Sequence, residues 1–300
     1  MKSHTPESVT EAALRQMQTT ADERLKVVVE SAVRHLHAFA KEVNLTPAEW
    51  LKAIEFLTKV GHTCTATRQE FILLSDVLGL STLVNSLHDA TAIEEGTSTS
   101  LLGPFFREDA PQLPLGAQIS NRDKSEEILV WGTVRSTAGA AVPNAKLMVW
   151  QTSSTGAYDL QEGTGDAIDY RGEFRTDMEG RFHLRTVRPL GYYIPMDGPV
   201  GDLIRAQRRE GCRPAHIHFL ISAPGFRELV TALYFRDRYL ARDVVFGVSP
   251  TLVVTEKASD AEAPVQGLPS VHFDFTMSRA GSTDPVGGRV GADPAKLVGQ

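Results

Sequence analysis

The feature that most constrains the fold of this chain is a change of pattern near residue 101, where helix-forming sequence gives way to short β-rich runs. From this point Gly and Pro become frequent, and turn signals such as Glu179-Gly180 separate short apolar stretches. The expected strands are 128–134, 146–152, 181–187, 216–222, 229–235, 251–255 and 271–277. Short strands without intervening helices predict a mainly β protein with a β-sandwich or barrel.

Residues 8 to about 95 carry a helical pattern instead. Apolar side chains recur at three- and four-residue spacing in 25–39, 50–57 and 71–87, so each run presents an apolar stripe. Two capping signals, each with a Glu three residues after a Thr, support the first two helices: Thr20 with Glu23, and Thr46 with Glu49.

The two patterns predict a division into domains. We expect an α-helical linker or dimerisation domain in 1–100, a β-sandwich catalytic domain in 101–280, and a mobile tail in 281–300 that is rich in Gly, Pro and Asp. The helical stripes are candidates for contact with a second subunit, because nothing in this segment looks catalytic.

The bulk composition excludes several classes of protein. The 300 residues carry a formal charge of -6, and Lys and Arg are scattered, so no basic footprint for nucleic acid is present. No apolar run is long enough to span a membrane, and the polar start lacks a signal-peptide core, so we expect a cytoplasmic protein. Only Cys64 and Cys212 occur, which argues against a disulfide framework and against a cysteine metal site.

The sharpest chemical feature is a pair of histidines, His216 and His218, on the expected strand 216–222. Alternation along a strand points both imidazoles to one face, where they could share a metal ion. The alternative is a pair of surface histidines, because a two-residue pattern is common by chance. The other seven histidines are interpreted as structural or surface residues: His4, His35, His37, His62, His88, His183 and His272.

Tyrosines are the next candidate ligands. Tyr158 follows the expected strand 146–152, and Tyr192 lies in a turn-rich segment. Phenolate is a hard, anionic ligand, so two phenolates would favour a trivalent ion over zinc. Taken alone, each tyrosine is more typical of a packed aromatic residue with a hydrogen-bonded hydroxyl group than of a metal ligand.

Four separated motifs together resemble the intradiol ring-cleaving dioxygenases, in the same order and at similar spacing. They are Leu102-Gly103-Pro104-Phe105-Phe106, Gly156-Ala157-Tyr158, Gly191-Tyr192 and Arg213-Pro214-Ala215-His216-Ile217-His218. The resemblance implies a non-haem Fe(III) site with the ligands Tyr158, Tyr192, His216 and His218. It also implies a homodimer formed through the N-terminal helices, with room for a lipid-like ligand at that interface.

The same resemblance implies roles for further residues. Tyr192 is the ligand expected to leave the iron and accept a proton from the diol, and Arg213 is expected to stabilise developing negative charge. The alternative for Arg213 is a structural salt bridge. The implied ring contacts are Leu80, Asn85, Gly103, Pro104, Phe105, Ile194 and Pro195. Asn85 and Asp76 are candidate partners for an additional ring hydroxyl.

Within the family, the chain is most similar to the hydroxyquinol 1,2-dioxygenases, which implies that hydroxyquinol reacts with O2 to give maleylacetate. The strings that carry this likeness include Asp197-Gly198-Pro199-Val200-Gly201 and Asp243-Val244-Val245-Phe246-Gly247. The chain departs from that pattern at Tyr193, often Pro in those enzymes, and at Ala232, often His. Catechol and substituted catechols remain alternative substrates. A colourless zinc-dependent hydrolase and a non-catalytic binding sandwich are alternatives from other classes.

Overall fold

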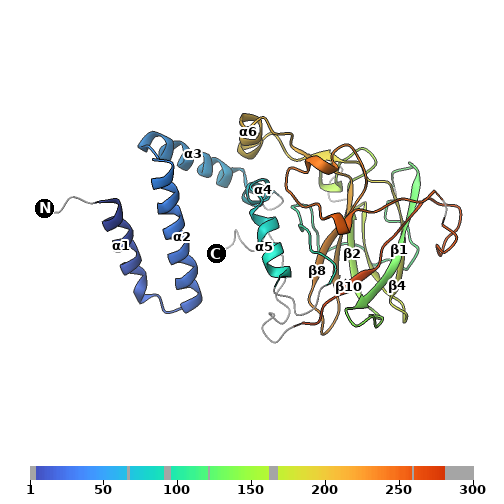
Figure 1. Cartoon of the computed structure of the whole chain (residues 1–300). Helices are drawn as coiled ribbons and strands as arrows, with labels where there is room; N and C mark the ends of the chain where they lie inside the picture. The colour runs from blue at the N-terminus through green and yellow to red at the C-terminus, as the bar shows by residue number, and fades with distance from the viewer. Residues whose placement is uncertain are drawn as a thin grey trace. The chain divides into compact units, whose positions relative to one another are not determined.

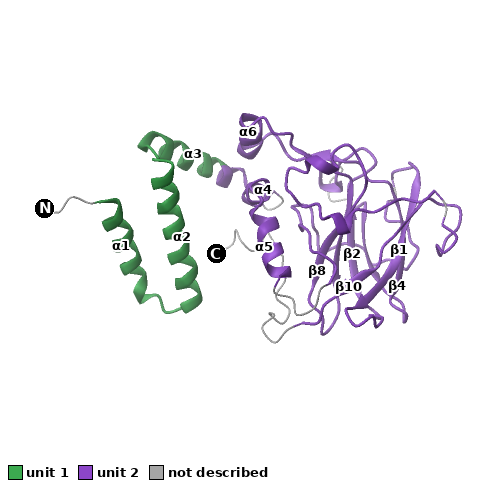
Figure 2. Cartoon of the chain, in the orientation of Figure 1, with its two compact units in different colours: residues 1–59 green, residues 60–300 purple. Residues whose placement is uncertain are grey.

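The computed structural model describes residues 5–65, 68–90, 96–120, 122–161, 168–258 and 260–280. The segment 281–300, for which the sequence predicts a mobile tail, lies outside these residues. The chain divides into two compact units, which we call the helical unit (1–59) and the β-rich unit (60–300), as Figure 2 shows.

The helical unit consists of α1 (Pro6–Gln16), a 3-10 turn (Met17–Thr19), α2 (Glu23–Glu42) and most of α3 (Pro47–Thr63). The capping signal at α3 is confirmed, since the Thr46 backbone N–H donates to Glu49 Oε2 at 2.9 Å and the Glu49 N–H donates to Thr46 Oγ1 at 3.3 Å. For α2, the predicted cap is wrong by two residues. Asp22, not Thr20, caps this helix, because its Oδ1 accepts the Leu25 N–H at 2.9 Å.

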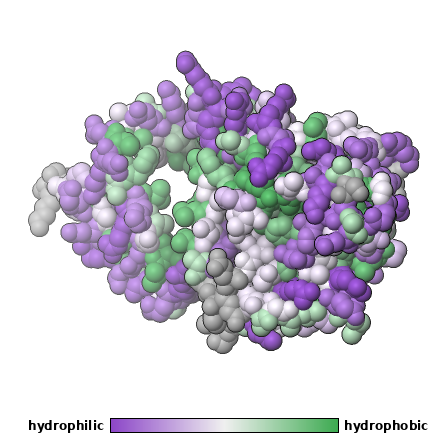
Figure 3. Space-filling model, turned by 45° about the vertical axis from the view of Figure 1, so that its right-hand side comes forward, coloured by the Kyte–Doolittle hydropathy of each residue, from purple (hydrophilic) through white to green (hydrophobic). Residues whose placement is uncertain are grey.

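Apolar side chains of the helical unit stay largely exposed. Those that are at least half exposed are Leu25, Val27, Leu36, Phe39, Val43, Trp50 and Leu51. Figure 3 shows green apolar surface along one side of these helices and purple polar surface along the other. Leu14 is the one described residue of the unit that is buried, so its helices do not cover their own apolar stripes.

The β-rich unit begins with the last residues of α3, followed by α4 (Glu70–Val77) and α5 (Leu80–Asp89). The sequence predicts one run over 71–87, but Gly79 takes a φ of 75° and ends the first helix there. No single described helix is long and apolar enough to cross a membrane, although α4 and α5 together, bent by 73°, meet the criteria of length and composition.

Two four-stranded sheets form the sandwich that the sequence predicts (Figure 1). One sheet contains β1 (Glu127–Ser136), β4 (Arg181–Val187), β9 (Ser270–His272) and β10 (Phe275–Met277). The other has the order β3 (Arg171–Arg175), β2 (Lys146–Gln151), β7 (His216–Ser222) and β8 (Leu229–Tyr234). The main core lies between them, where Val130 and Leu184 of the first sheet cluster with Val149 and Phe219 of the second.

The remaining elements are short. A two-stranded ribbon joins β5 (Tyr192–Tyr193) to β6 (Cys212–Arg213), and α6 (Pro199–Ala206) lies between these strands in sequence. Three further 3-10 turns are Asp159–Gln161, Leu240–Arg242 and Pro250–Leu252. The strand expected over 251–255 is wrong, because the chain turns at Pro250 and pairs with the sheet only through an isolated bridge at Val253.

The alternation of β7 places polar and apolar side chains on opposite faces of its sheet. Ile217, Phe219 and Ile221 enter the main core. His216 and His218 are buried on the other face, which is covered by a second cluster composed of Phe105, Met148, Trp150, Tyr158, Tyr192, Leu220 and Val230. The candidate site therefore lies on the outer face of this sheet and is sealed by the loops that precede and follow its strands.

Candidate functional site

His216 and His218 bring their ring nitrogens together. Their Nε2 atoms lie 2.9 Å apart, and His216 Nδ1 lies 2.7 Å from the carbonyl oxygen of Pro214. Because that carbonyl can only accept, Nδ1 of His216 carries the proton and its Nε2 presents a lone pair. Trp150, opposite His218 on β2, stacks on that imidazole with ring centroids 4.8 Å apart. The His216 imidazole is thus oriented as metal ligands usually are, with one ring nitrogen tied to the backbone.

Tyr158 reaches the same point from the loop after β2. Its hydroxyl oxygen lies 3.3 Å from His216 Nε2, and the side chain is fully buried. Gly156 has a φ of 88°, and a Cβ there would lie 3.3 Å from the carbonyl oxygen of Gly191, so the loop needs glycine at this position. Phe105 stacks on the Tyr158 ring with centroids 4.2 Å apart.

Tyr192 completes the group from the short ribbon. It pairs with Arg213 across β5 and β6, and its ring centroid lies 5.5 Å from that of Tyr158 and 5.9 Å from that of His216. Two phenols and two imidazoles from three separate parts of the chain therefore converge on one buried point.

The surroundings set the protonation of this group. Burial lowers the pKa of both imidazoles well below the usual value, and the Arg213 guanidinium lowers them further. Burial also raises the pKa of the Tyr158 phenol well above its usual value, and Tyr192 adds to the increase. The imidazoles are therefore neutral, as metal binding requires, whereas the buried phenol needs a cation nearby before it releases its proton.

This donor set suits a hard, highly charged ion. Phenolate oxygens favour such ions, and neutral imidazoles accept most first-row metals. Among the described residues, no three His, Cys, Asp or Glu side chains lie together in a cluster that could hold a metal ion. A zinc site built on the His pair would therefore lack the carboxylate or thiolate that commonly completes it, and the tyrosines are the available partners.

Arg213 is buried beside the four side chains and is held by an acid. Its Nε lies 3.3 Å from Asp243 Oδ1, and its Nη2 lies 3.4 Å from the Tyr234 hydroxyl. Arg213 thus forms the structural salt bridge that was considered as its alternative role, here with Asp243. It also lies beside the candidate ligands, so the salt bridge does not exclude the catalytic role. Asp243 and Tyr234 are residues that sequence reasoning missed as site components. Alternation along 229–235 could have indicated Tyr234, which lies opposite His216 in the strand register.

A cavity of about 380 Å³ lies beside the site and is lined by four of the seven expected ring contacts, Leu80, Asn85, Gly103 and Pro104. A Cβ on Gly103 would lie 3.7 Å from His218 Nε2, so this wall of the cavity reaches the candidate ligands. The other three do not line it. Phe105 packs on Tyr158, Ile194 is buried with its N–H donating to the Gly211 carbonyl, and Pro195 is half-buried in the same segment.

The two candidate partners for an extra hydroxyl group both line this cavity. Asn85 Nδ2 already donates to the Ser100 carbonyl at 2.9 Å. Asp76 is buried, and burial raises its pKa to about 6, against the opposing effects of Ser81 and Arg213. Asp76 is therefore a carboxyl group that offers a proton-dependent hydrogen-bond partner to a ligand in the cavity.

The two positions that depart from the hydroxyquinol pattern lie in different surroundings. Tyr193 is 55% exposed and packs edge-on against Tyr239, so its ring points away from the buried group. Ala232 is fully buried and lies opposite His218 in the register of β7 and β8. Its small side chain leaves the His218 ring to stack on Trp150 alone.

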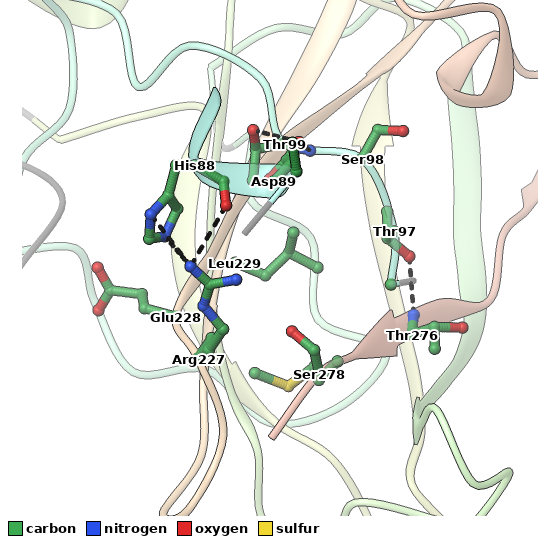
Figure 4. Close-up of a pocket in the computed structure, with 13 residues that line it drawn as sticks. His88, Asp89, Thr97, Ser98, Thr99, Arg227, Glu228, Leu229, Thr276 and Ser278 are labelled. Carbon is green, nitrogen blue, oxygen red and sulfur yellow. Dashed lines mark hydrogen bonds between the residues drawn. The ribbon is translucent and has the colours of Figure 1, made fainter. Parts of the chain in front are cut away.

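A second cavity, of about 390 Å³, adjoins the first and shares His88, Thr99 and Glu228 with it. Figure 4 shows Arg227 reaching His88, with its Nη2 at 2.7 and 3.0 Å from the two ring nitrogens. Asp89 accepts both the backbone N–H and the hydroxyl of Thr99. This cavity is lined by both polar and apolar residues and contains none of the four candidate ligands.

Comparisons with known proteins agree with the geometry. The family model described as "Dioxygenase" matches residues 101–279, and the model described as "Catechol dioxygenase N terminus" matches 22–96. The chain is 43% identical to the intradiol ring-cleavage dioxygenase hqdA of Aspergillus niger, over 92% of this chain and 86% of that protein. It is 41% identical to the 6-chlorohydroxyquinol 1,2-dioxygenase of Cupriavidus pinatubonensis, over 93% and 99%.

A solved structure, the hydroxyquinol 1,2-dioxygenase of Pseudomonas putida, superposes with a TM-score of 0.84 at 39% identity, covering 92% of this chain and 99% of that one. Catechol 1,2-dioxygenases match as well, at lower identity.

Proposed function

The chain belongs to the intradiol ring-cleavage dioxygenases, and on that premise we propose that it converts hydroxyquinol (benzene-1,2,4-triol) with O2 to maleylacetate at a ferric ion held by Tyr158, Tyr192, His216 and His218. The observation that carries the proposal is the convergence of these four side chains, with the two Nε2 atoms 2.9 Å apart and the Tyr158 oxygen 3.3 Å from one of them. Ferric iron, when bound there, supplies activation of the diol toward O2 without an external reductant.

The residues around the site would accept protons from the substrate and stabilise its negative charge. The family resemblance assigns to the phenol oxygen of Tyr192, which is 6% exposed whereas Tyr158 is fully buried, the role of taking a proton from an arriving diol. Arg213 is a fixed, buried cation beside both tyrosines and would stabilise negative charge that develops on the ring. The ring itself would lie in the cavity beside Gly103, where Leu80, Leu102 and Pro104 supply apolar contacts.

Hydroxyquinol is favoured over catechol by Asp76. A catechol ring would leave this buried carboxyl group with its Ser81 hydrogen bond but without the one from the ligand, and a lost hydrogen bond to a charged group is worth about 1–3 kcal/mol. We therefore expect a preference for hydroxyquinol of roughly ten- to a hundredfold in kcat/KM, with slow turnover of catechol.

The helical unit would form a homodimer. The unit leaves its apolar stripes, which include Leu36 and Phe39, exposed, because its own helices do not bury them. Large exposed apolar surfaces mark contacts with proteins or lipids. We place the dimer contact there, with a lipid-like ligand as a further occupant of the same apolar surface.

A visible absorption spectrum combined with metal analysis tests the proposed site. Two phenolates on ferric iron should give a red protein with a broad charge-transfer band and about one iron per chain. A colourless protein that contains zinc would support the hydrolase alternative. A protein without stoichiometric metal would support the non-catalytic sandwich.

A further inference from the structure

The guanidinium of Arg213 lies in a place where an unpartnered charge would be costly. Arg213 is 3% exposed. Its charge interacts with those of the four candidate ligands and with Tyr234. A buried ion persists only when a partner of opposite charge and well-placed hydrogen bonds compensate the lost hydration. The orientation of Arg213 is therefore set by its partners.

Asp243 is the acidic partner of Arg213, and the loop that carries it also holds it by a backbone hydrogen bond. Its Oδ1 lies 3.3 Å from Arg213 Nε, and its Oδ2 accepts the Gly247 N–H at 2.9 Å. A Cβ on Gly247 would lie 3.0 Å from the Tyr234 hydroxyl and 3.4 Å from Arg213 Nη2, so the loop closes tightly over the pair. The carboxylate thus has little freedom to follow the guanidinium if it moves.

A second anchor holds the other end of the guanidinium. The Tyr234 hydroxyl lies 3.4 Å from Arg213 Nη2 and 2.7 Å from Ser100 Oγ. Ser100 also lines the cavity beside the candidate ligands. The network therefore connects the Asp243 loop, strand β8 and the wall of the substrate cavity through one arginine.

We propose that Asp243 is a positioning residue, which holds Arg213 beside the tyrosines, with Tyr234 as the second anchor. The proposal rests on the proposed function, because it assigns Asp243 a role in diol cleavage that acts through Arg213.

A double-mutant cycle on the iron-loaded protein tests the catalytic part. Asp243→Asn should lower kcat roughly a hundredfold, since a misplacement of about 1 Å can have that effect, while iron content and the visible band stay as in the wild type. The same change should have no further effect on kcat in an Arg213→Gln background. Glu210→Gln is the matched control, because it removes an acid from the exposed pair with Arg242 and should leave kcat unchanged.

Tyr234→Phe provides a milder variant. It should lower kcat by about three- to tenfold, the usual effect of one hydrogen bond, and should also add nothing in the Arg213→Gln background. In both cycles the expected signature is a kcat loss with KM changed by less than about threefold.

Unfolding of the iron-free protein gives a readout that does not depend on activity. Asp243→Asn leaves Arg213 as a buried unpaired charge and should lower Tm by roughly 10 °C, whereas Arg213→Met with Asp243→Asn should recover most of that loss. The proposal is overturned if the kcat losses of Asp243→Asn and Arg213→Gln multiply, or if Asp243→Asn keeps the wild-type kcat. A wild-type protein that opens no diol would refute the proposed function, and the catalytic role of Asp243 with it, whatever the unfolding cycle shows.

Discussion

Replacing Asp76 with asparagine should stabilise the protein while it damages substrate choice. Burial raises the pKa of this carboxyl group from 3.8 to about 6 in the folded chain. The folded protein therefore binds the proton more tightly than the unfolded chain does, and stability falls as pH rises between these two values. A difference of this size corresponds to about 3 kcal/mol lost above pH 6.

An asparagine side chain carries no charge at any of these pH values, so the variant should avoid this loss. In iron-free protein, Asp76→Asn should unfold at a Tm several degrees above the wild type at pH 7.5, since 1 kcal/mol moves Tm by about 2–4 °C in a domain of this size. The gain should shrink toward zero near pH 4. Asp109→Asn is the control, because the exposed Asp109 has its pKa lowered by Arg107 and should show no such gain.

The assay is thermal unfolding of wild type, Asp76→Asn and Asp109→Asn at several values between pH 4 and pH 7.5. The same Asp76→Asn protein, loaded with iron, should lose most of its preference for hydroxyquinol over catechol. An Asp76→Asn protein that is no more stable than the wild type at pH 7.5, or whose gain does not depend on pH, would refute the reasoning from burial.

Three further predictions concern the metal and the subunit contact. Substituting His218 by Ala should remove iron and colour together, and a coloured, active variant would contradict its assignment as a ligand. Tyr158→Phe and Tyr192→Phe should each shift or weaken the visible band with a large loss of kcat, while an unchanged spectrum would exclude that tyrosine. Leu36→Glu should convert a dimer to a monomer in sedimentation at micromolar concentration, and a wild type that is already monomeric would remove the proposed contact.

Much of the β architecture could be predicted from sequence because its central strands are strongly patterned. Strand β7 matches the predicted 216–222, since apolar and polar residues alternate there and both faces become buried. Strand β3 is absent from the sequence prediction, because Arg171–Arg175 is largely polar and has Gly172 as its second residue. Helix α6 was missed for a related reason, since Gly198, Pro199 and Gly201 are more typical of a turn than of a helix.

The candidate site was predictable only as a set of residues. The His-x-His spacing places both imidazoles on one face of a strand by geometry alone. Tyr158 and Tyr192 lie outside the long strands. No local sequence pattern predicts that they approach the strand face that carries the two imidazoles. Their positions depend on tertiary packing, such as the contact between the Gly156 and Gly191 loops. The partners of Arg213 depend on the same long-range contacts.

Oxygen uptake with product identification tests the central claim most directly. Purified, iron-loaded protein should consume one O2 for each hydroxyquinol and give maleylacetate, with kcat/KM roughly ten- to a hundredfold above that for catechol, which should yield cis,cis-muconate. Absence of O2 uptake with either substrate, or a product in which the ring is not cleaved between two adjacent hydroxyl-bearing carbons, would contradict the account.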